Sequence, residues 1–324
     1  MPIVEVQNLV KKFGDLTAVN DLSFEVKEGE AFGFLGPNGA GKTTTINILC
    51  TMLWPTSGRA SVNGFDCVKD SAQVRQSIGL VFQDPTLDNG LTAYENLEFH
   101  AYLYNLSRKT MKERIAELMK VVDLEARQHD VVKKFSGGMK RRLEIARGLL
   151  HRPRVFFLDE PTLGLDPQTR FNIWEFIHRL RREEGITLFM TTHYMDEAEN
   201  CDRVAIIDKG RLIALDSPGE LKAMVKEDHL RLVTANNEAA KREIMERFGI
   251  EAKFENGELH LEVEKGNEFI PTLVRELSVP VTSVTVQKPT LNEVFLRLTG
   301  RTIRAEEGGA FDGLRTRLRA KNRI

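Results

Sequence analysis

The chain has 324 residues, 41% of them hydrophobic, and is therefore long enough to form more than one compact unit with a substantial core. Because 46 Lys and Arg residues nearly balance 47 Asp and Glu residues, the charge gives no reason to expect nucleic acid as a partner. No apolar run approaches the ~18 residues of a membrane span, and no signal peptide is evident. The three widely spaced cysteines are typical of small buried side chains in a reducing compartment; they are Cys50, Cys67 and Cys201.

The first motif is a glycine-rich loop between an apolar run and a helix-compatible run. Residues 31–35 predict a buried strand, and residues 43–52 predict a helix. Between them lies the phosphate-loop pattern G-x-x-x-x-G-K-[ST]. Its glycines let backbone N–H groups curl around phosphate oxygens in conformations that a Cβ would obstruct. The predicted phosphate-binding residues are Gly36, Pro37, Asn38, Gly39, Ala40, Gly41, Lys42, Thr43 and Thr44.

Two side chains of this loop suit phosphate chemistry directly. Lys42 carries a positive charge that can reach the β- and γ-phosphates, and Thr43 offers a hydroxyl to Mg²⁺. The dipole of the following helix also favours an anion at its N-terminus. We therefore expect a nucleotide and Mg²⁺ at this loop.

The next segment combines a polar strand end with a helical region. Gln83 follows a short apolar run, and its amide is a candidate ligand for Mg²⁺ and the γ-phosphate. Thr92 and Glu95 fit a capping box, and apolar residues then recur at helical spacing. We interpret residues 84–150 as a mostly helical subdomain.

A second candidate anion site opens a helix inside this subdomain. Ser136, Gly137 and Gly138 precede a charged and apolar helical run. The bare backbone N–H groups at such a helix start attract phosphate. This segment is therefore predicted to bind phosphate a second time.

Two later apolar runs also end in polar residues. Residues 155–158 predict a central strand followed by Asp159, a candidate Mg²⁺ ligand, and Glu160, a candidate general base. Residues 186–190 predict another strand, after which His193 can orient water or bond the γ-phosphate. Such strand ends are where ligands bind in an open α/β sheet.

These motifs together resemble the ATP-binding subunit of an ATP-binding-cassette (ABC) transporter over residues 3–218. The loop at 36–43 resembles Walker A, and residues 155–159 resemble Walker B. Further matches, by role, are the catalytic glutamate Glu160, the Q-loop Gln83, the switch His193, the signature Ser136 to Gly138, the D-loop residue Asp166 and the adenine-stacking Phe13. An ordinary strand-end core position is the alternative for Phe13.

The signature segment departs from the commonest family form at two positions. Phe135 stands for Leu and Met139 for Gln, while Ser136 to Gly138 is intact. Met at the last position resembles the drug- and polymer-exporting branch. The departures therefore do not affect the expectation of ATP binding. They concern how the signature segment transmits changes across the interface between the two subunits.

The resemblance implies a dimer of two-fold or pseudo-two-fold symmetry that closes around ATP, and a separate transmembrane permease. It also implies a P-loop NTPase fold and a peripheral position on the cytoplasmic side of the cell membrane. The aromatic residues that could receive the permease are Tyr94, Phe99, Tyr102 and Tyr104. Core packing is the equal alternative for these rings.

The C-terminal third follows a different pattern. After Ser217 to Glu220, the elements read as βαββαβ, with a hairpin turn at Asn256-Gly257, which suggests a small ferredoxin-like α+β domain. We expect an ATPase domain at 1–218, this domain at 228–299 and a basic tail at 300–324. The tail is either solvated or in electrostatic contact with the anionic inner membrane surface or the permease.

The end of the small domain carries a branch-specific pattern. Residues 289–296 resemble the tail motif of daunorubicin-resistance-type exporters. The same residues read as an amphipathic helix that docks on the small domain. Both interpretations are compatible with the sequence.

The most favoured function is therefore an ATPase subunit of an exporter. The alternative is a soluble cassette ATPase of DNA repair or translation control, but long coiled-coil insertions and a second cassette are missing from the sequence. A regulatory module without catalysis is disfavoured by intact Lys42, Asp159, Glu160 and His193.

Overall fold

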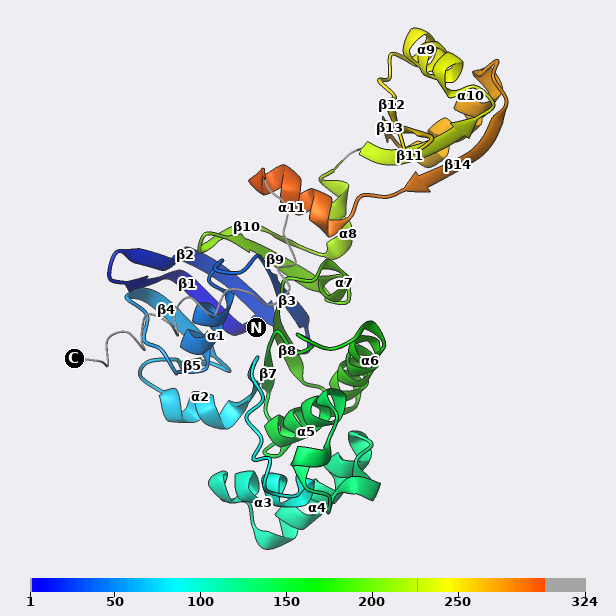
Figure 1. The fold of residues 1–324 in the computed structure, drawn as a ribbon. Helices are drawn as coiled ribbons and strands as arrows, with labels where there is room; N and C mark the ends of the chain where they lie inside the picture. The colour runs from blue at the N-terminus through cyan, green and yellow to red at the C-terminus, as the bar shows by residue number, and fades with distance from the viewer. Residues whose placement is uncertain (1, 226, 301–324) are drawn as a thin grey trace, which may run out of the picture.

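The computed structural model describes residues 2–225 and 227–300. They form a mixed α/β body and a smaller C-terminal unit that projects from it on two chain segments (Figure 1). The basic tail expected at 300–324 lies outside the described residues, except for Gly300. In the described part of the chain, no helix is both long and apolar enough to cross a membrane.

The centre of the body is a six-stranded sheet in the order β10-β9-β3-β8-β7-β6. Five strands are parallel and β10 runs antiparallel at one edge. The strands are β3 (Ala31–Leu35), β6 (Ile78–Val81), β7 (Val155–Asp159), β8 (Thr187–Thr192), β9 (Arg203–Asp208) and β10 (Arg211–Asp216). The strands expected at 31–35, 155–158 and 186–190 are thus confirmed, within a few residues at their ends, and the short apolar run before Gln83 lies mostly in β6.

Both faces of this sheet are buried, as its continuous apolar runs require. On one face Phe32, Phe34 and Phe189 pack together, with ring centroids 5.4 Å apart for Phe32 and Phe189. On the other face Leu35 and Leu158 join the core beneath the helices. The side chains alternate between these two cores because strand residues point to opposite faces in turn.

A four-stranded antiparallel sheet, β2-β1-β4-β5, covers the first face together with two helices. The elements are β1 (Pro2–Phe13), β2 (Leu16–Lys27), β4 (Ser57–Val62), β5 (Phe65–Asp66), α1 (Lys42–Leu49) and α2 (Ser71–Ser77). The three cysteines are buried, as expected for small apolar side chains.

The other face carries the remaining helices of the body. They are α3 (Ala93–Leu103), α4 (Arg108–Val121), α5 (Gly137–Leu149), α6 (Pro167–Glu184), α7 (Met195–Ala198) and α8 (Pro218–Ala223), with short 3₁₀ turns at Glu125–Arg127 and Val132–Lys134. Thr92 and Glu95 form the expected capping box at the start of α3. The helical character expected for 84–150 is therefore confirmed, and Figure 1 shows α3 and α4 together at one end of the body.

The C-terminal unit has the predicted βαββαβ order. Its sheet is antiparallel in the order β12-β13-β11-β14, the arrangement of a ferredoxin-like fold. The elements are β11 (Glu227–Thr234), α9 (Asn237–Phe248), β12 (Lys253–Glu255), β13 (Glu258–Glu264), α10 (Gly266–Glu276) and β14 (Val281–Gln287). Asn256 and Gly257 both have positive φ and form the hairpin turn between β12 and β13, as expected.

The apolar face of the last helix, α11 (Leu291–Thr299), does not pack on this sheet, so that expectation is wrong, although Glu293 and Arg297 form ion pairs with His229 and Glu227 of β11. Its buried Leu291, Val294 and Phe295 belong to the core of the body, together with Leu221 of α8. The spacing of apolar residues along the sequence predicted that the helix has an apolar face. It could not predict which part of the chain that face packs against. The chain leaves the body at α8 and returns to α8 through α11 (Figure 1).

This return predicts that α11 stabilises the body. Phe295→Ala should lower the free energy of unfolding by about 3–5 kcal/mol, because Phe295 is 0% exposed. Leu296→Ala is the matched control, since Leu296 is 41% exposed and should change stability by less than about 0.5 kcal/mol. Tryptophan fluorescence during urea unfolding is a suitable measurement, because Trp54 and Trp174 both lie in the body. An unchanged midpoint for Phe295→Ala would contradict the packing of α11 on the body.

Candidate nucleotide-binding site

The parallel register brings several predicted site residues to one edge of the central sheet. Leu35 of β3 pairs with Thr192 of β8, and Asp159 of β7 pairs with Thr191 of β8. The phosphate loop, Glu160 and His193 follow directly after these strand ends. They therefore meet at the edge where ligands bind in parallel sheets.

The loop between β3 and α1 requires glycine for steric reasons. Gly41 has φ of 102°, and a Cβ there would lie 2.5 Å from the carbonyl oxygen of Ala18. A Cβ on Gly36 would lie 2.5 Å from the carbonyl oxygen of Ile207. Backbone atoms of the antiparallel sheet (Ala18) and of the central sheet (Ile207) thus contact the loop from two sides and fix its conformation. Asn38 and Gly39 at its tip, and Thr43 at the helix start, are exposed.

Lys42 lies inside this loop and is only 4% exposed. Its Nζ donates hydrogen bonds to the carbonyl oxygens of Gly36 at 2.8 Å and Pro37 at 3.2 Å. The same Nζ lies 3.1 Å from Oε1 of Glu160. The ammonium is therefore held by its own loop and by the carboxylate that was predicted to act as a base.

Glu160 is held by backbone hydrogen bonds and by contacts of its carboxylate with Lys42 and His193. Its φ is 46°, in the left-handed region that a side chain rarely adopts, and its N–H donates to the backbone oxygen and Oγ1 of Thr191. His193 Nδ1 lies 3.3 Å from Oε2. Burial by itself would raise the pKa of Glu160, but His193 and Lys42 outweigh it and hold that pKa below its usual value.

Asp159 forms a separate oxygen-rich group beside Glu160. Its Oδ1 accepts a hydrogen bond from Thr191 Oγ1 at 2.5 Å and lies 3.4 Å from Thr43 Oγ1. Burial raises the pKa of the Asp159 carboxyl, and the two hydroxyls partly offset this effect. A carboxylate and a hydroxyl are donors that suit Mg²⁺, so the residues fit that ion.

The sequence reasoning did not assign a role to Thr191, although this residue touches both carboxylate residues. Its hydroxyl donates to Asp159 and accepts from the backbone of Glu160. The only signal in the sequence for such a role was that Thr191 is a polar residue near the end of a predicted buried strand. The pairing of Thr191 with Asp159, however, follows only from the register of β7 and β8.

The second candidate anion site lies at the start of α5. Ser136 is the N-cap and accepts from the N–H of Met139, which leaves Gly137 and Gly138 at the first turn. Asp166 caps the neighbouring α6 in the same way and accepts from the N–H of Thr169 at 3.0 Å. A Cβ on Gly138 would lie 2.7 Å from Cγ2 of Thr169, so the two helix starts are in close contact.

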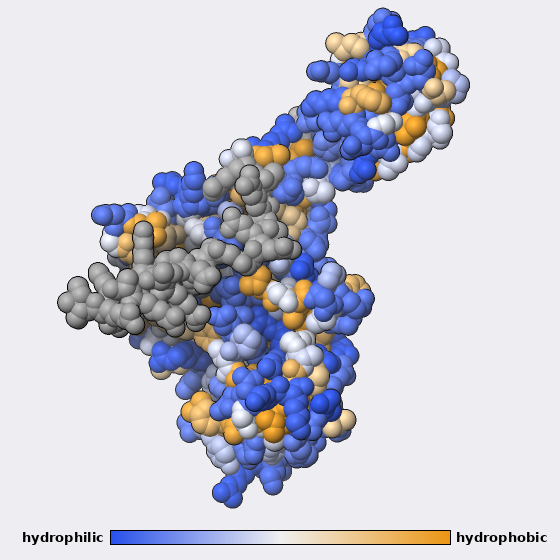
Figure 2. All heavy atoms as spheres, viewed as in Figure 1, coloured by the Kyte–Doolittle hydropathy of each residue, from blue (hydrophilic) through white to orange (hydrophobic). Residues whose placement is uncertain are grey.

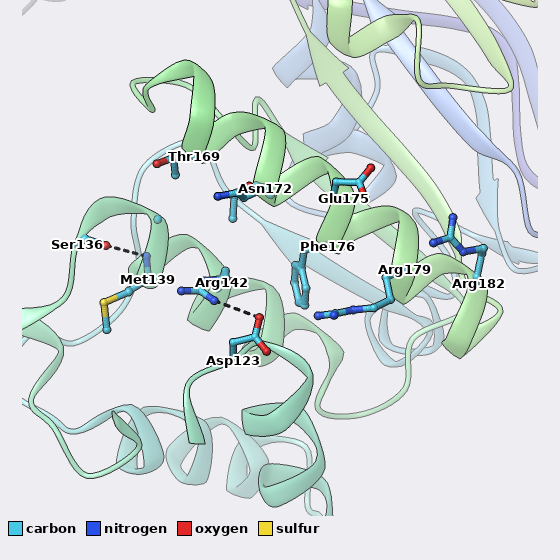
Figure 3. A pocket seen from close by; sticks show the side chains of 12 residues that line it. Asp123, Ser136, Met139, Arg142, Thr169, Asn172, Glu175, Phe176, Arg179 and Arg182 are labelled. Atoms are coloured by element: carbon cyan, nitrogen blue, oxygen red, sulfur yellow. Dashed lines mark hydrogen bonds and ion pairs between the residues drawn. The ribbon is translucent and has the colours of Figure 1, made fainter. Parts of the chain in front are cut away.

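A cleft of about 460 Å³ runs between α5 and α6 from these helix starts (Figure 3). Thr169, Asn172, Phe176 and Arg179 line it along α6, and Figure 3 shows Arg142 paired with Asp123 across its floor. Among the described residues, no hydrogen bond or ion pair joins Ser136 to Gly138 with the phosphate loop of the same chain. The two segments predicted to bind phosphate are thus not joined to each other by hydrogen bonds or ion pairs within the described chain.

The structure does not bring two other predicted residues into the cluster. Gln83 follows β6 and is exposed. Phe13 ends β1 and is 46% exposed, with Nζ of Lys11 5.0 Å from its ring centroid. The alternative of a buried core position for Phe13 is therefore wrong, because its ring faces solvent.

Both parts of the chain match known protein families. Residues 19–163 match the family model described as ABC transporter, and residues 217–299 match that of the DrrA1-3-like ATP-binding protein C-terminal domain. The linearmycin resistance ATP-binding protein LnrL of Bacillus subtilis is 38% identical over 93% of this chain and 100% of its own length. The daunorubicin resistance ATP-binding protein DrrA3 of Streptomyces coeruleorubidus is 37% identical over 94% of this chain and 98% of its own.

Solved structures resemble the body. The dimeric ATP-binding cassette MJ0796, in a post-hydrolysis state with ADP and phosphate, has a TM-score of 0.59 and 29% identity, over 66% of this chain and 98% of its own. CbiO1 of Clostridium perfringens, part of the transporter complex cbiONQ, has a TM-score of 0.64 and 30% identity, over 76% of this chain and 96% of its own.

The lowered pKa of Glu160 predicts a pH dependence of stability. The native state favours the ionised carboxylate, so this contribution is present above the ordinary pKa of 4.5 and is lost as the pH falls through the lower native value. Glu160→Gln removes it at every pH. In urea titrations, the unfolding free energy of wild type minus that of the variant should therefore decrease from about pH 7 to about pH 4. Burial, the largest cause of the raised pKa of Asp159, is present in both proteins, although Glu160→Gln removes the smaller contribution of the Glu160 charge. A difference that stays constant would contradict the assignment.

Proposed function

The chain belongs to the ABC transporter family as an ATP-binding subunit, and on that premise we propose that it dimerises around ATP and drives export through a separate membrane permease. It is an ATPase by family, and a structural neighbour was captured with ADP and phosphate. The observation that carries the proposal for this chain is the buried cluster of Lys42, Glu160 and His193 directly behind the phosphate loop.

We assign each group of the cluster a part in hydrolysis. The backbone N–H groups of 36–43 and Lys42 bind the phosphates of ATP, and Phe13 stacks on adenine. Glu160 accepts a proton from the attacking water, and His193 orients that water or bonds the γ-phosphate. Thr43, Asp159 and the exposed Gln83 would hold Mg²⁺, which neutralises phosphate charge when bound.

The pairing of Lys42 with Glu160 supports an order for these events. The carboxylate of Glu160 neutralises the ammonium of Lys42 at 3.1 Å. Phosphate oxygens compete for the same ammonium. When Lys42 turns to them, Glu160 loses a cation that holds its pKa down, and its carboxylate becomes a better proton acceptor.

A second copy completes the site in this proposal. The helix start at Ser136 to Gly138 lies apart from the phosphate loop of its own chain, and the start of α6 at Asp166 lies beside it. In a two-fold homodimer these helix starts close over the nucleotide of the partner. Hydrolysis removes the γ-phosphate and with it the bond between the subunits.

The permease surface is proposed at α3. Phe99 is 56% exposed and Tyr102 is 51% exposed, whereas Tyr104 stacks on His151 at 3.8 Å. Core packing therefore does not account for Phe99 and Tyr102. Figure 2 shows hydrophobic surface at the end of the body that α3 and α4 form. We propose that this surface receives the permease and keeps the chain on the cytoplasmic side of the membrane.

The relatives favour export over other work. Their names refer to linearmycin resistance, daunorubicin resistance and Nod factor export. The soluble alternative in DNA repair or translation control is not favoured. We retain the division into 1–218 and 228–299 as a proposal, with α11 stabilising the first part.

The role of Glu160 predicts a separation of binding from turnover. Glu160→Gln should keep ATP affinity within about threefold and lower kcat by about 10²- to 10⁴-fold, because the amide cannot accept the proton. ATP binding by fluorescence titration and phosphate release measure the two effects. Glu183→Gln is the matched control, since Glu183 is exposed on α6 away from the cluster. Normal phosphate release by Glu160→Gln would exclude this residue as the base.

The proposed partner can be recovered directly. Tagged Glu160→Gln, purified with ATP from detergent-extracted host membranes, should carry a multi-helix membrane protein identifiable by mass spectrometry. Adding Phe99→Ala and Tyr102→Ala should abolish recovery, whereas Phe254→Ala should not, because Phe254 is exposed on β12 instead. Recovery of only ribosomal or DNA-associated proteins would favour the soluble alternative.

A further inference from the structure

A buried arginine joins three segments that are distant in the sequence. Arg141 lies on α5, one turn after the glycines that begin the helix, and is 6% exposed. Its guanidinium donates to the carbonyl oxygens of Phe82 at 2.6 Å, Glu160 at 3.1 Å and Pro161. All three acceptors are backbone groups, so the contacts depend on the course of the chain rather than on neighbouring side chains.

The segment around Gln83 is held on both sides by the same helix. Phe82 accepts from Arg141, and four residues later Thr86 donates its N–H to Oε1 of Glu144 at 2.8 Å. Oε2 of Glu144 pairs with Arg141 at 3.0 Å. Arg147 adds a bond to the carbonyl oxygen of Thr86 at 3.1 Å. Gln83 is therefore exposed between two residues, Phe82 and Thr86, that are both hydrogen-bonded to α5.

Glu160 is also held on both sides. Thr191 accepts from its N–H, and Arg141 donates to its carbonyl oxygen. Its left-handed φ of 46° persists only where neighbouring groups impose it. The direction of the Glu160 carboxylate thus depends on a bond from α5 as well as on β8.

The chemistry of arginine suits this position. Its planar guanidinium presents five donors in a rigid fork and can serve several acceptors at once, which the single ammonium of lysine cannot do in the same geometry. Glu144 supplies the compensating charge, so the buried pair is neutral as a unit. The sequence showed Arg141 and Glu144 only as polar residues three apart on a helix.

We propose that Arg141, supported by Glu144, is a positioning residue that sets Glu160 and the Gln83 segment in register with the start of α5. The inference rests on the assignment of Glu160 as the general base. A displacement of α5, when its N-terminus engages nucleotide or when α3 is displaced, is then transmitted through one guanidinium to both segments.

The test uses the full-length chain with three variants. Arg141→Gln removes the fork but leaves Glu144 buried without a partner, so it is accompanied by the double variant Arg141→Gln/Glu144→Gln, which removes both charges. Arg114→Gln is the matched control. Arg114 is a buried arginine that bonds Glu184 and the carbonyl oxygen of Leu149, and its contacts do not include 82–86 or 160–161.

Kinetics should separate positioning from stability. We expect kcat to fall about 10- to 100-fold in Arg141→Gln and in the double variant, with ATP affinity within about threefold of wild type. The double variant should regain thermal stability without regaining kcat. Arg114→Gln should lose thermal stability while its kcat per folded molecule stays near wild type.

Hydrogen–deuterium exchange gives a readout that does not depend on turnover. Exchange should rise together in residues 82–91 and 160–165 of Arg141→Gln, and in neither segment of Arg114→Gln. Unchanged exchange in both segments, or a kcat in the double variant equal to that of wild type, would overturn the inference. Lack of ATPase activity in wild type would instead count against the proposed function, and exchange would still decide the role of Arg141.

Discussion

The ion pair between Lys42 and Glu160 is the interaction on which the site depends. Both groups are nearly buried, and a buried charge is tolerated only when it is paired and hydrogen-bonded. The loop carbonyls accept hydrogen bonds from Lys42, and Nδ1 of His193 lies 3.3 Å from the Glu160 carboxylate. In the proposed function anionic phosphate competes for the same cation, so the ion pair that stabilises this edge of the sheet is also the contact that nucleotide would change.

The pair exists because three strands end side by side. Lys42 follows β3, Glu160 follows β7 and His193 follows β8, and the parallel register brings these ends to one edge. This arrangement requires unfavourable backbone geometry at two positions. Glu160 adopts a left-handed conformation. Gly41 lies so near the carbonyl oxygen of Ala18 that any side chain there would clash. Close packing on both faces of the sheet holds this geometry in place.

Helix α5 connects this edge with the rest of the molecule. Its N-terminus presents Ser136 beside the start of α6, and its buried Arg141 reaches the carbonyl oxygens of Phe82 and Glu160. The same helix therefore carries the segment proposed to bind phosphate and the arginine proposed to position Glu160. The C-terminal unit is connected differently, since its only return to the body in the described chain is through α11, which packs with α8.

The sequence by itself determined the features that depend on local pattern. Apolar runs predicted the central strands, the loop at 36–43 predicted the phosphate site, and Asn256-Gly257 predicted a hairpin, because period, sterics and turn chemistry act between near neighbours. Tertiary structure alone decided that Thr191 lies against Asp159, that Arg141 reaches Glu160, and that α11 covers the body rather than the small sheet. These contacts join residues far apart along the chain, and their partners are fixed by strand register and packing, which no local pattern encodes.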